Sequence, residues 1–252
     1  MVHRMDDPFS TVDLDDGSMV DMTMPGVKED TDSAVVHSMQ GALSYYLHEY
    51  QDAVDAFTKA INVYVLRPNE SEKLIELYRQ RAEAYRKLEN YTAVVVDYSK
   101  GLELDPQRGQ FYCSRGIAYK MLEQYDLALQ DYTTAMQVAP QLAEPYYCRA
   151  ILYSVVLHKP ELAIADYTEA LQREPALAQA YMNRGHDYLQ VGNFEQALAD
   201  YTQVIQLQPE LAVAYYERGS VYKLLAQPES ARKDYEQALQ LDPALKKLAN
   251  YL

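Results

Sequence analysis

The chain has 252 residues, of which 48% are hydrophobic and 24% charged, and its formal net charge is −14. This composition is typical of a globular protein and excludes collagen-like and wholly disordered classes. The negative charge argues against nucleic acid and anionic membrane surfaces as partners. No apolar run is long enough to cross a bilayer, and residues 1–33 lack the apolar stretch of a secretory signal. Cys113 and Cys148 are too few for a disulfide scaffold, so we predict a cytoplasmic protein without membrane insertion.

The first 33 residues differ in composition from the rest. They hold eight aspartates and one glutamate against one arginine and one lysine, a net charge of −7. Because carboxylates repel one another and apolar surface is scarce, we predict an acidic disordered tail over residues 1–33. It is interpreted as a solubilising segment. The alternative is a docking segment that uses Phe9, Val12 and Leu14.

A repeat organises the remainder of the chain. Five prolines, at 106, 140, 175, 209 and 243, are separated by 34, 35, 34 and 34 residues. If each proline is placed at position 32, the repeat units start near residues 34, 75, 109, 143, 178 and 212. Unit 2 is preceded by seven extra residues around 63–74, and unit 4 has one extra residue within 154–160. Such a period is the signature of a stacked repeat protein.

Each unit carries two apolar stripes at helical spacing. Positions 4, 8 and 11 recur on a first helix, and positions 20, 24 and 27 on a second helix. Position 8 is Gly or Ala, whereas position 24 is Phe57 in unit 1 and Tyr in the others. If the two helices fold back on each other, position 8 faces position 24, so a large ring meets a small residue. The proline at position 32 ends the second helix, because it cannot continue the hydrogen-bond ladder.

These columns resemble those of the tetratricopeptide repeat (TPR) family over residues 34–245. The resemblance implies an all-α, right-handed superhelical solenoid of six TPR helix-turn-helix hairpins, with the TPR domain over residues 34–252. Residues 244–252 carry apolar side chains at helical spacing, which predicts a short C-terminal capping helix. Unit 1 departs from the pattern at His37 and Ser44, and no unit has Trp at position 4.

Two charged columns run through units 2–6, with Arg at position 7 and Asp at position 23. Both positions border the apolar seam, so we predict partly buried Arg–Asp pairs. The alternative is a row of unpaired arginines that binds phosphates or carboxylates. Reversing both charges in one unit should recover the stability lost by Asp200→Arg alone.

The sequence contains no catalytic, metal-binding or phosphate-binding motif. The five histidines are scattered, and Cys113 and Cys148 form no C-x-x-C or other metal-ligand spacing. The few glycines form no phosphate-binding loop. We therefore expect no catalytic residue, no cofactor and no metal, and free thiols at both cysteines.

The TPR resemblance places a concave binding face at positions 2, 5, 6, 9, 12 and 13 of each first helix. Tyrosines beyond the packing columns offer rigid anchors, and several cations form a basic strip in an acidic protein. The candidate partner-binding residues are Tyr45, Tyr46, Arg79, Arg86, Lys87, Lys120, Tyr147, Asn183, His186 and Tyr216. A protein or peptide segment with acidic and apolar residues would match them, and the acidic tail could itself cover this groove.

The sequence predicts a non-enzymatic adaptor or scaffold that binds a peptide or helix of a partner protein. One alternative is an assembly factor or co-chaperone that holds a client protein transiently, although only Asn183 fits a family clamp for C-terminal carboxylates. A pentatricopeptide-like RNA-binding array is disfavoured by the acidic charge. The end units also offer surfaces for self-association.

Overall fold

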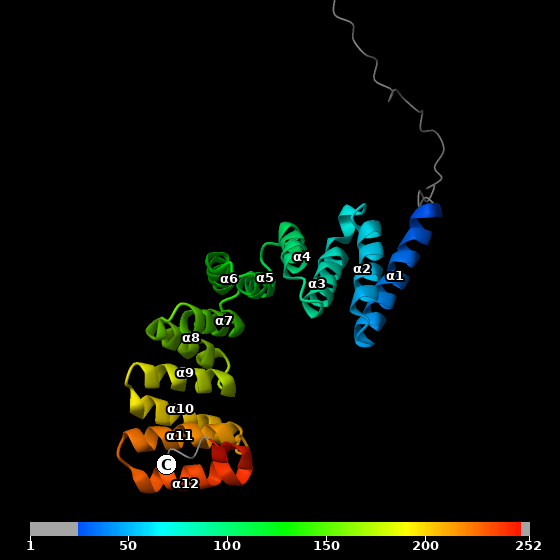
Figure 1. The fold of residues 1–252 in the computed structure, drawn as a ribbon. Helices are drawn as coiled ribbons and strands as arrows, with labels where there is room; N and C mark the ends of the chain where they lie inside the picture. The colour runs from blue at the N-terminus through cyan, green and yellow to red at the C-terminus, as the bar shows by residue number, and fades with distance from the viewer. Residues whose placement is uncertain (1–24, 248–252) are drawn as a thin grey trace, which may run out of the picture.

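The computed structural model describes residues 25–247, and all of their regular elements are helical. Consecutive helices fold into antiparallel hairpins that stack side by side, and the direction of the hairpins turns along the stack (Figure 1). None of the helices in the described range is long and apolar enough to cross a membrane. The α-helices are α1 Pro25–Tyr46, α2 Tyr50–Tyr64, α3 Ser71–Lys87, α4 Tyr91–Leu104, α5 Gly109–Met121, α6 Tyr125–Val138, α7 Glu144–Ile151, α8 Pro160–Arg173, α9 Ala178–Gln190, α10 Phe194–Leu207, α11 Ala212–Leu224 and α12 Pro228–Leu241. Three short elements are η1 Pro68–Glu70, η2 Leu152–Val156 and η3 Pro243–Lys247.

The seam inside each hairpin is built as the sequence predicts. Gly116 on α5 lies so close to Tyr132 on α6 that an added Cβ atom would stand 2.7 Å from the ring. Gly41 makes the same approach to Phe57. These rings are almost fully buried, so the large-against-small pairing of positions 8 and 24 is confirmed.

The tyrosines at position 4 differ from this pattern, because most of them are only half-buried. Four of them pack against the arginine at position 7 of their own unit, and the fifth, Tyr146, packs against Arg173. The Arg184 guanidinium, for example, lies 5.6 Å from the ring centres of both Tyr181 and Tyr188. The ring faces therefore provide cation–π contacts at the border of the core.

The predicted Arg–Asp pairs are confirmed in units 2–6, and each lies within one hairpin. In unit 5, Arg184 Nε donates to Asp200 Oδ2 at 2.8 Å, and Nη2 donates to Oδ1 at 2.7 Å. Nη1 of the same arginine donates to the Thr168 hydroxyl on the preceding hairpin at 2.8 Å. The alternative of unpaired arginines is therefore wrong. The other pairs are Arg81–Asp97, Arg115–Asp131, Arg149–Asp166 and Arg218–Asp234.

One predicted boundary differs from the structure. Helix α1 begins at Pro25, so the predicted end of the disordered tail at residue 33 is too late. A packed helix extends backwards at low cost once it has been nucleated, and proline is favoured at its first position. At the other end of the stack, residues 243–247 form the short 3₁₀-helix η3, which covers the first part of the predicted cap. Residues 1–24 and 248–252, which hold the rest of both predictions, lie outside the described residues.

The extra residue of unit 4 is absorbed inside its first helix. Helix α7 ends at Ile151 and continues as the π-helical turn η2, which holds one more residue per turn than an α-helix. The turn places the Ser154 hydroxyl on the Asp187 carboxylate of α9, with Oγ 2.6 Å from Oδ1. Asp187 is only 2% exposed, although the equivalent residue of the next unit is the apolar Val221.

Candidate protein-binding groove

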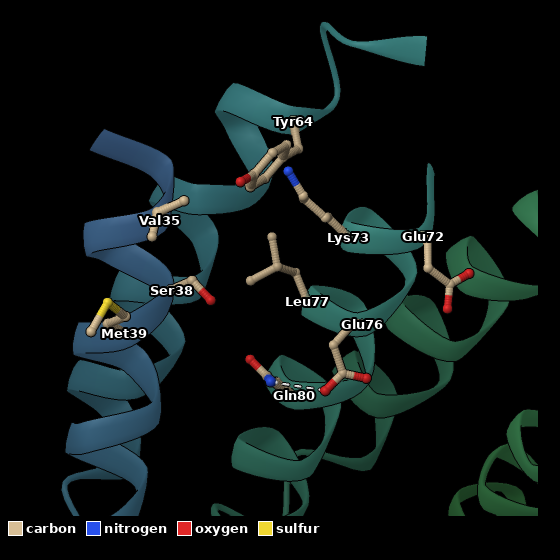
Figure 2. Close-up of a pocket in the computed structure, with 9 residues that line it drawn as sticks. All are labelled: Val35, Ser38, Met39, Tyr64, Glu72, Lys73, Glu76, Leu77 and Gln80. Carbon is tan, nitrogen blue, oxygen red and sulfur yellow. Dashed lines mark hydrogen bonds between the residues drawn. The ribbon is translucent and has the colours of Figure 1, made fainter. Parts of the chain in front are cut away.

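The structure opens a groove between α1 and α3 on the face formed by the first helices of units 1 and 2. Its first hollow has a volume of about 410 Å³ (Figure 2). The side chains of α1 and α3 face each other across it, and Tyr64 of α2 lies at one end. The lining residues are Val35, Ser38, Met39, Tyr64, Glu72, Lys73, Glu76, Leu77 and Gln80.

Two further hollows continue the first along the same helices. The second, of about 350 Å³, shares Gln80 with the first and has Phe57 in its lining. The third, of about 760 Å³, shares Ala42 and Tyr45 with the second. We call the three together the α1–α3 groove. The additional lining residues are Ala42, Tyr45, Phe57, Arg79 and Glu83 in the second hollow and Tyr46, Leu47, His48, Tyr50 and Lys87 in the third.

The α1 side of the groove combines small and exposed apolar side chains. Ser38 and Ala42 are too short to fill the space towards α3, which leaves the hollows open. Met39 and Tyr46 are 68% and 79% exposed, and Tyr45 is held edge-on against Tyr50 with ring centres 5.5 Å apart. Burial raises the pKa of the Tyr45 hydroxyl, so it stays protonated. Exposed apolar side chains gathered beside a groove are typical of an interaction site.

The charges on the α3 side are largely compensated. Arg79 donates to both carboxylate oxygens of Glu76, at 2.8 and 2.6 Å, and Arg86 pairs with Glu83 at 2.8 Å. The hydrogen bond from Arg79 lowers the pKa of Glu76. The structure therefore replaces the predicted basic strip on α3 with alternating charges. The signal for this was the spacing of each glutamate three residues before its arginine, which is a helical pairing distance.

The structure divides the ten predicted site residues between two regions. Tyr45, Tyr46, Arg79 and Lys87 line the α1–α3 groove, and Arg86 pairs with its lining residue Glu83. The other five lie on later helices. Sequence reasoning missed Val35, Tyr64 and Leu77 as lining residues. Tyr64 is the last residue of α2, next to the extra residues that precede unit 2, and that break in the period was the available signal.

The later predicted residues lie on α5, α7, α9 and α11, and four of the five contact a neighbouring tyrosine. Asn183 Nδ2 donates to the Tyr147 hydroxyl at 3.5 Å. His186 lies edge-on to Tyr201, with ring centres 5.7 Å apart, and Tyr216 lies 5.5 Å from Tyr235. Lys120 is on α5 and half-buried. These residues are spread along the stack and do not gather into one site.

The fold also brings the two cysteines together, contrary to the expectation that they belong to no ligand set. Cys113 on α5 and Cys148 on α7 meet Glu144, and their three potential ligand atoms lie within 4.8 Å of one another. The spacing along the sequence gave no sign of this, because the register of neighbouring hairpins creates the contact. The neighbouring Cys148 thiol, together with burial, raises the pKa of the Cys113 thiol.

The stacked hairpins and their curved face define the class of helical repeat solenoids, whose first helices form an extended binding surface. Models of the tetratricopeptide repeat match residues 75–108, 109–142, 178–211 and 212–245. These four segments span more than half of the chain. The chain therefore belongs to the tetratricopeptide repeat family.

Individual relatives share parts of the chain or its fold. A serine/threonine-protein phosphatase T of Aspergillus oryzae is 35% identical over 83 residues, which cover 33% of this chain and 16% of the phosphatase. The solved structure of YrrB, described as a TPR protein with an unusual peptide-binding site, is 24% identical, with a TM-score of 0.63 over 79% of this chain and all of YrrB. A tetratricopeptide repeat protein of Parabacteroides merdae is 19% identical, with a TM-score of 0.64 over 87% of this chain and 88% of that one. A MamA structure is 21% identical, with a TM-score of 0.61 over 71% of this chain and 95% of MamA.

Proposed function

We propose that this protein is a non-enzymatic adaptor of the cytoplasm that binds a peptide or helix of a partner protein in the α1–α3 groove. The observation that carries the proposal is the run of three adjoining hollows between these helices, bordered by exposed apolar side chains. The YrrB structure supports peptide binding as the general mode of action, because that TPR protein is described with a peptide-binding site.

The lining favours a partner segment with apolar anchors flanked by charges of both signs. Met39, Tyr46 and Leu47 offer exposed apolar contact surface, which provides most of the affinity in a groove of this kind. The Glu76–Arg79 and Glu83–Arg86 pairs sit beside it. Because each arginine already has a carboxylate partner, an acidic residue of the ligand would have to compete for it. These charges therefore select the orientation of the bound segment more than they add to its affinity.

Affinity purification with the full chain tests the proposal. Val35→Ser combined with Met39→Ser removes apolar surface from the groove, and both side chains are exposed, so folding should be retained. The matched control is Leu127→Ser with Leu162→Ser, two exposed leucines on α6 and α8. We expect the control to retain the partner set of the wild type and the groove variant to lose it. Equal retention by both variants would place binding elsewhere.

The same purification separates the adaptor from a transient client holder. A stable partner set that is the same with and without nucleotide supports the adaptor. Partners that change with nucleotide or with the folding state of the client support an assembly factor or co-chaperone.

A further inference from the structure

The contact between α5 and α7 brings together three side chains that can bind a metal ion. Cys113 Sγ, Cys148 Sγ and a Glu144 carboxylate oxygen lie within 4.8 Å of one another. Cys113 is fully buried, Cys148 is half-buried and Glu144 is exposed. The cluster therefore runs from the protein interior to the exposed surface at Glu144, which gives an ion a path of entry.

The neighbouring hairpins show what these positions hold elsewhere in the stack. One unit further along, they are occupied by Tyr147, Gln179 and Asn183. There Gln179 donates to Asn183 on the same helix at 3.0 Å, and Asn183 donates to the Tyr147 hydroxyl on α7, so one neutral hydrogen bond links the two helices. Cys113 alone could be a small apolar core residue. A second thiol and a carboxylate at its side are not needed for packing.

Two residues around the cluster are arranged as supporting groups of a metal site. The Gln110 side chain on α5 donates a hydrogen bond to the Glu144 carboxylate and thereby orients it. Tyr132 is fully buried, packs in the same cluster as Cys113 and Cys148, and its hydroxyl has no partner among the described residues. The tyrosine at the same position in unit 2, Tyr98, donates to Glu83 instead. Tyr201 also lacks a partner, but no thiol lies beside it.

We propose that Cys113, Cys148 and Glu144 bind one borderline-soft divalent cation of the zinc type. Thiolates select such ions over calcium and magnesium, and zinc accepts two sulfurs and a carboxylate oxygen in one tetrahedral site. With Zn–S bonds of about 2.3 Å, the two sulfurs would lie about 3.8 Å apart. The present limit of 4.8 Å between the ligand atoms is wider than this, so the side chains would move closer together around the ion. The fourth position would lie on the exposed side of the cluster, beside Glu144, where water can occupy it.

Cobalt(II) is the spectroscopic probe, used with the full chain under a phosphine reductant that keeps thiols reduced. Because the chain has only two cysteines, any thiolate-to-cobalt charge-transfer band reports on this cluster. We expect one cobalt ion per chain, a band that zinc abolishes, and loss of the band in Cys148→Ser. Glu144→Gln should weaken the affinity about tenfold or more. Its matched control is Glu195→Gln, which also lies in the first turn of a helix and should bind like the wild type.

Circular dichroism of each variant separates ligand loss from misfolding. If Cys148→Ser fails to fold, the exposed Glu144→Gln still decides the question, because removal of an exposed carboxylate leaves the core intact. The proposal is overturned by a reduced, folded chain that gives no charge-transfer band. It is also overturned by cobalt binding that stays unchanged in Glu144→Gln.

Discussion

At the scale of single residues, buried carboxylates have two different environments in this protein. Asp200 accepts two hydrogen bonds from Arg184, which favour its charged form and oppose the burial that raises its pKa. Asp187 is equally buried but accepts one hydrogen bond, from Ser154, and its Oδ2 atom has no partner among the described residues. Burial is the main cause that raises the pKa of Asp187, since the charged form is poorly solvated there.

Asp187→Asn should therefore stabilise the protein near neutral pH. A carboxyl with a raised pKa in the folded state contributes most to stability in acid. This contribution is lost as the pH rises above about 4, the usual pKa of an aspartate, and through the raised pKa of the folded state. Asparagine keeps an acceptor for Ser154 and removes the charge. We expect the free energy of unfolding to rise by about 1–3 kcal/mol at pH 7, and this gain should shrink towards zero in acid. Urea unfolding at pH 7 and at a pH below the usual pKa of an aspartate measures both. The exposed Asp55→Asn is the control, and a gain that does not depend on pH would contradict this account.

At the scale of helices, the arginine column joins neighbouring hairpins as well as the two helices of one hairpin. Each arginine donates its Nη1 hydrogen to a Ser or Thr hydroxyl on the second helix of the preceding unit. The acceptors are Thr58, Ser99, Thr133, Thr168 and Thr202. The hydrogen bond to Asp131 raises the pKa of the Arg115 guanidinium, so this arginine stays charged. One side chain thus fixes the register within a unit and between units.

Thr168→Val should weaken the contact between α8 and α9. Valine has a similar shape, but it leaves one guanidinium hydrogen of Arg184 without an acceptor. Thr134→Val is a matched control. The hydroxyls of Thr134 and Thr168 both donate to the backbone oxygen four residues before them, but among the described residues only Thr168 of the two accepts from an arginine. We expect Thr168→Val to lower the free energy of unfolding by about 1 kcal/mol more than Thr134→Val, measured by urea titration. Equal losses would show that the arginine contact adds nothing.

The helical seams could be predicted from the sequence because repetition exposes them. Position 8 against position 24, and Arg against Asp, recur often enough for the pairing to be derived from one unit and checked in the next. Features that occur once left no such pattern. How one hairpin packs against its neighbour decides the π-helical turn, the start of α1 and the Cys113–Cys148 contact. The spacing of three residues between Glu and Arg on α3 could have predicted their pairing. The basic strip was predicted from the cations alone, without the glutamates beside them.

At the scale of the whole molecule, the first hairpin is supported differently from the others. Val36 and Leu43 on the outer face of α1 are 60% and 59% exposed, and no described helix covers them. The equivalent residues of unit 3, Phe111 and Ala118, are buried against the preceding hairpin. Unit 1 also has Gln40 and Ala56 in place of the Arg–Asp pair. In a stack, stability is approximately the sum of each repeat and its interfaces, so unit 1 should be the least stable part of the described range.

Hydrogen–deuterium exchange of the full chain, followed by mass spectrometry, should show this difference directly. We expect the amides of α1 and α2 to exchange faster than those of α9 and α10, because a terminal hairpin can open without breaking a second interface. The double variant Arg184→Gln with Asp200→Ala gives unit 5 the two residues that unit 1 has at these positions. Exchange in α9 and α10 should then increase, yet stay slower than in α1 and α2, because unit 5 keeps neighbours on both sides. Equal protection of both hairpins in the wild type would mean that the stack opens as one cooperative body.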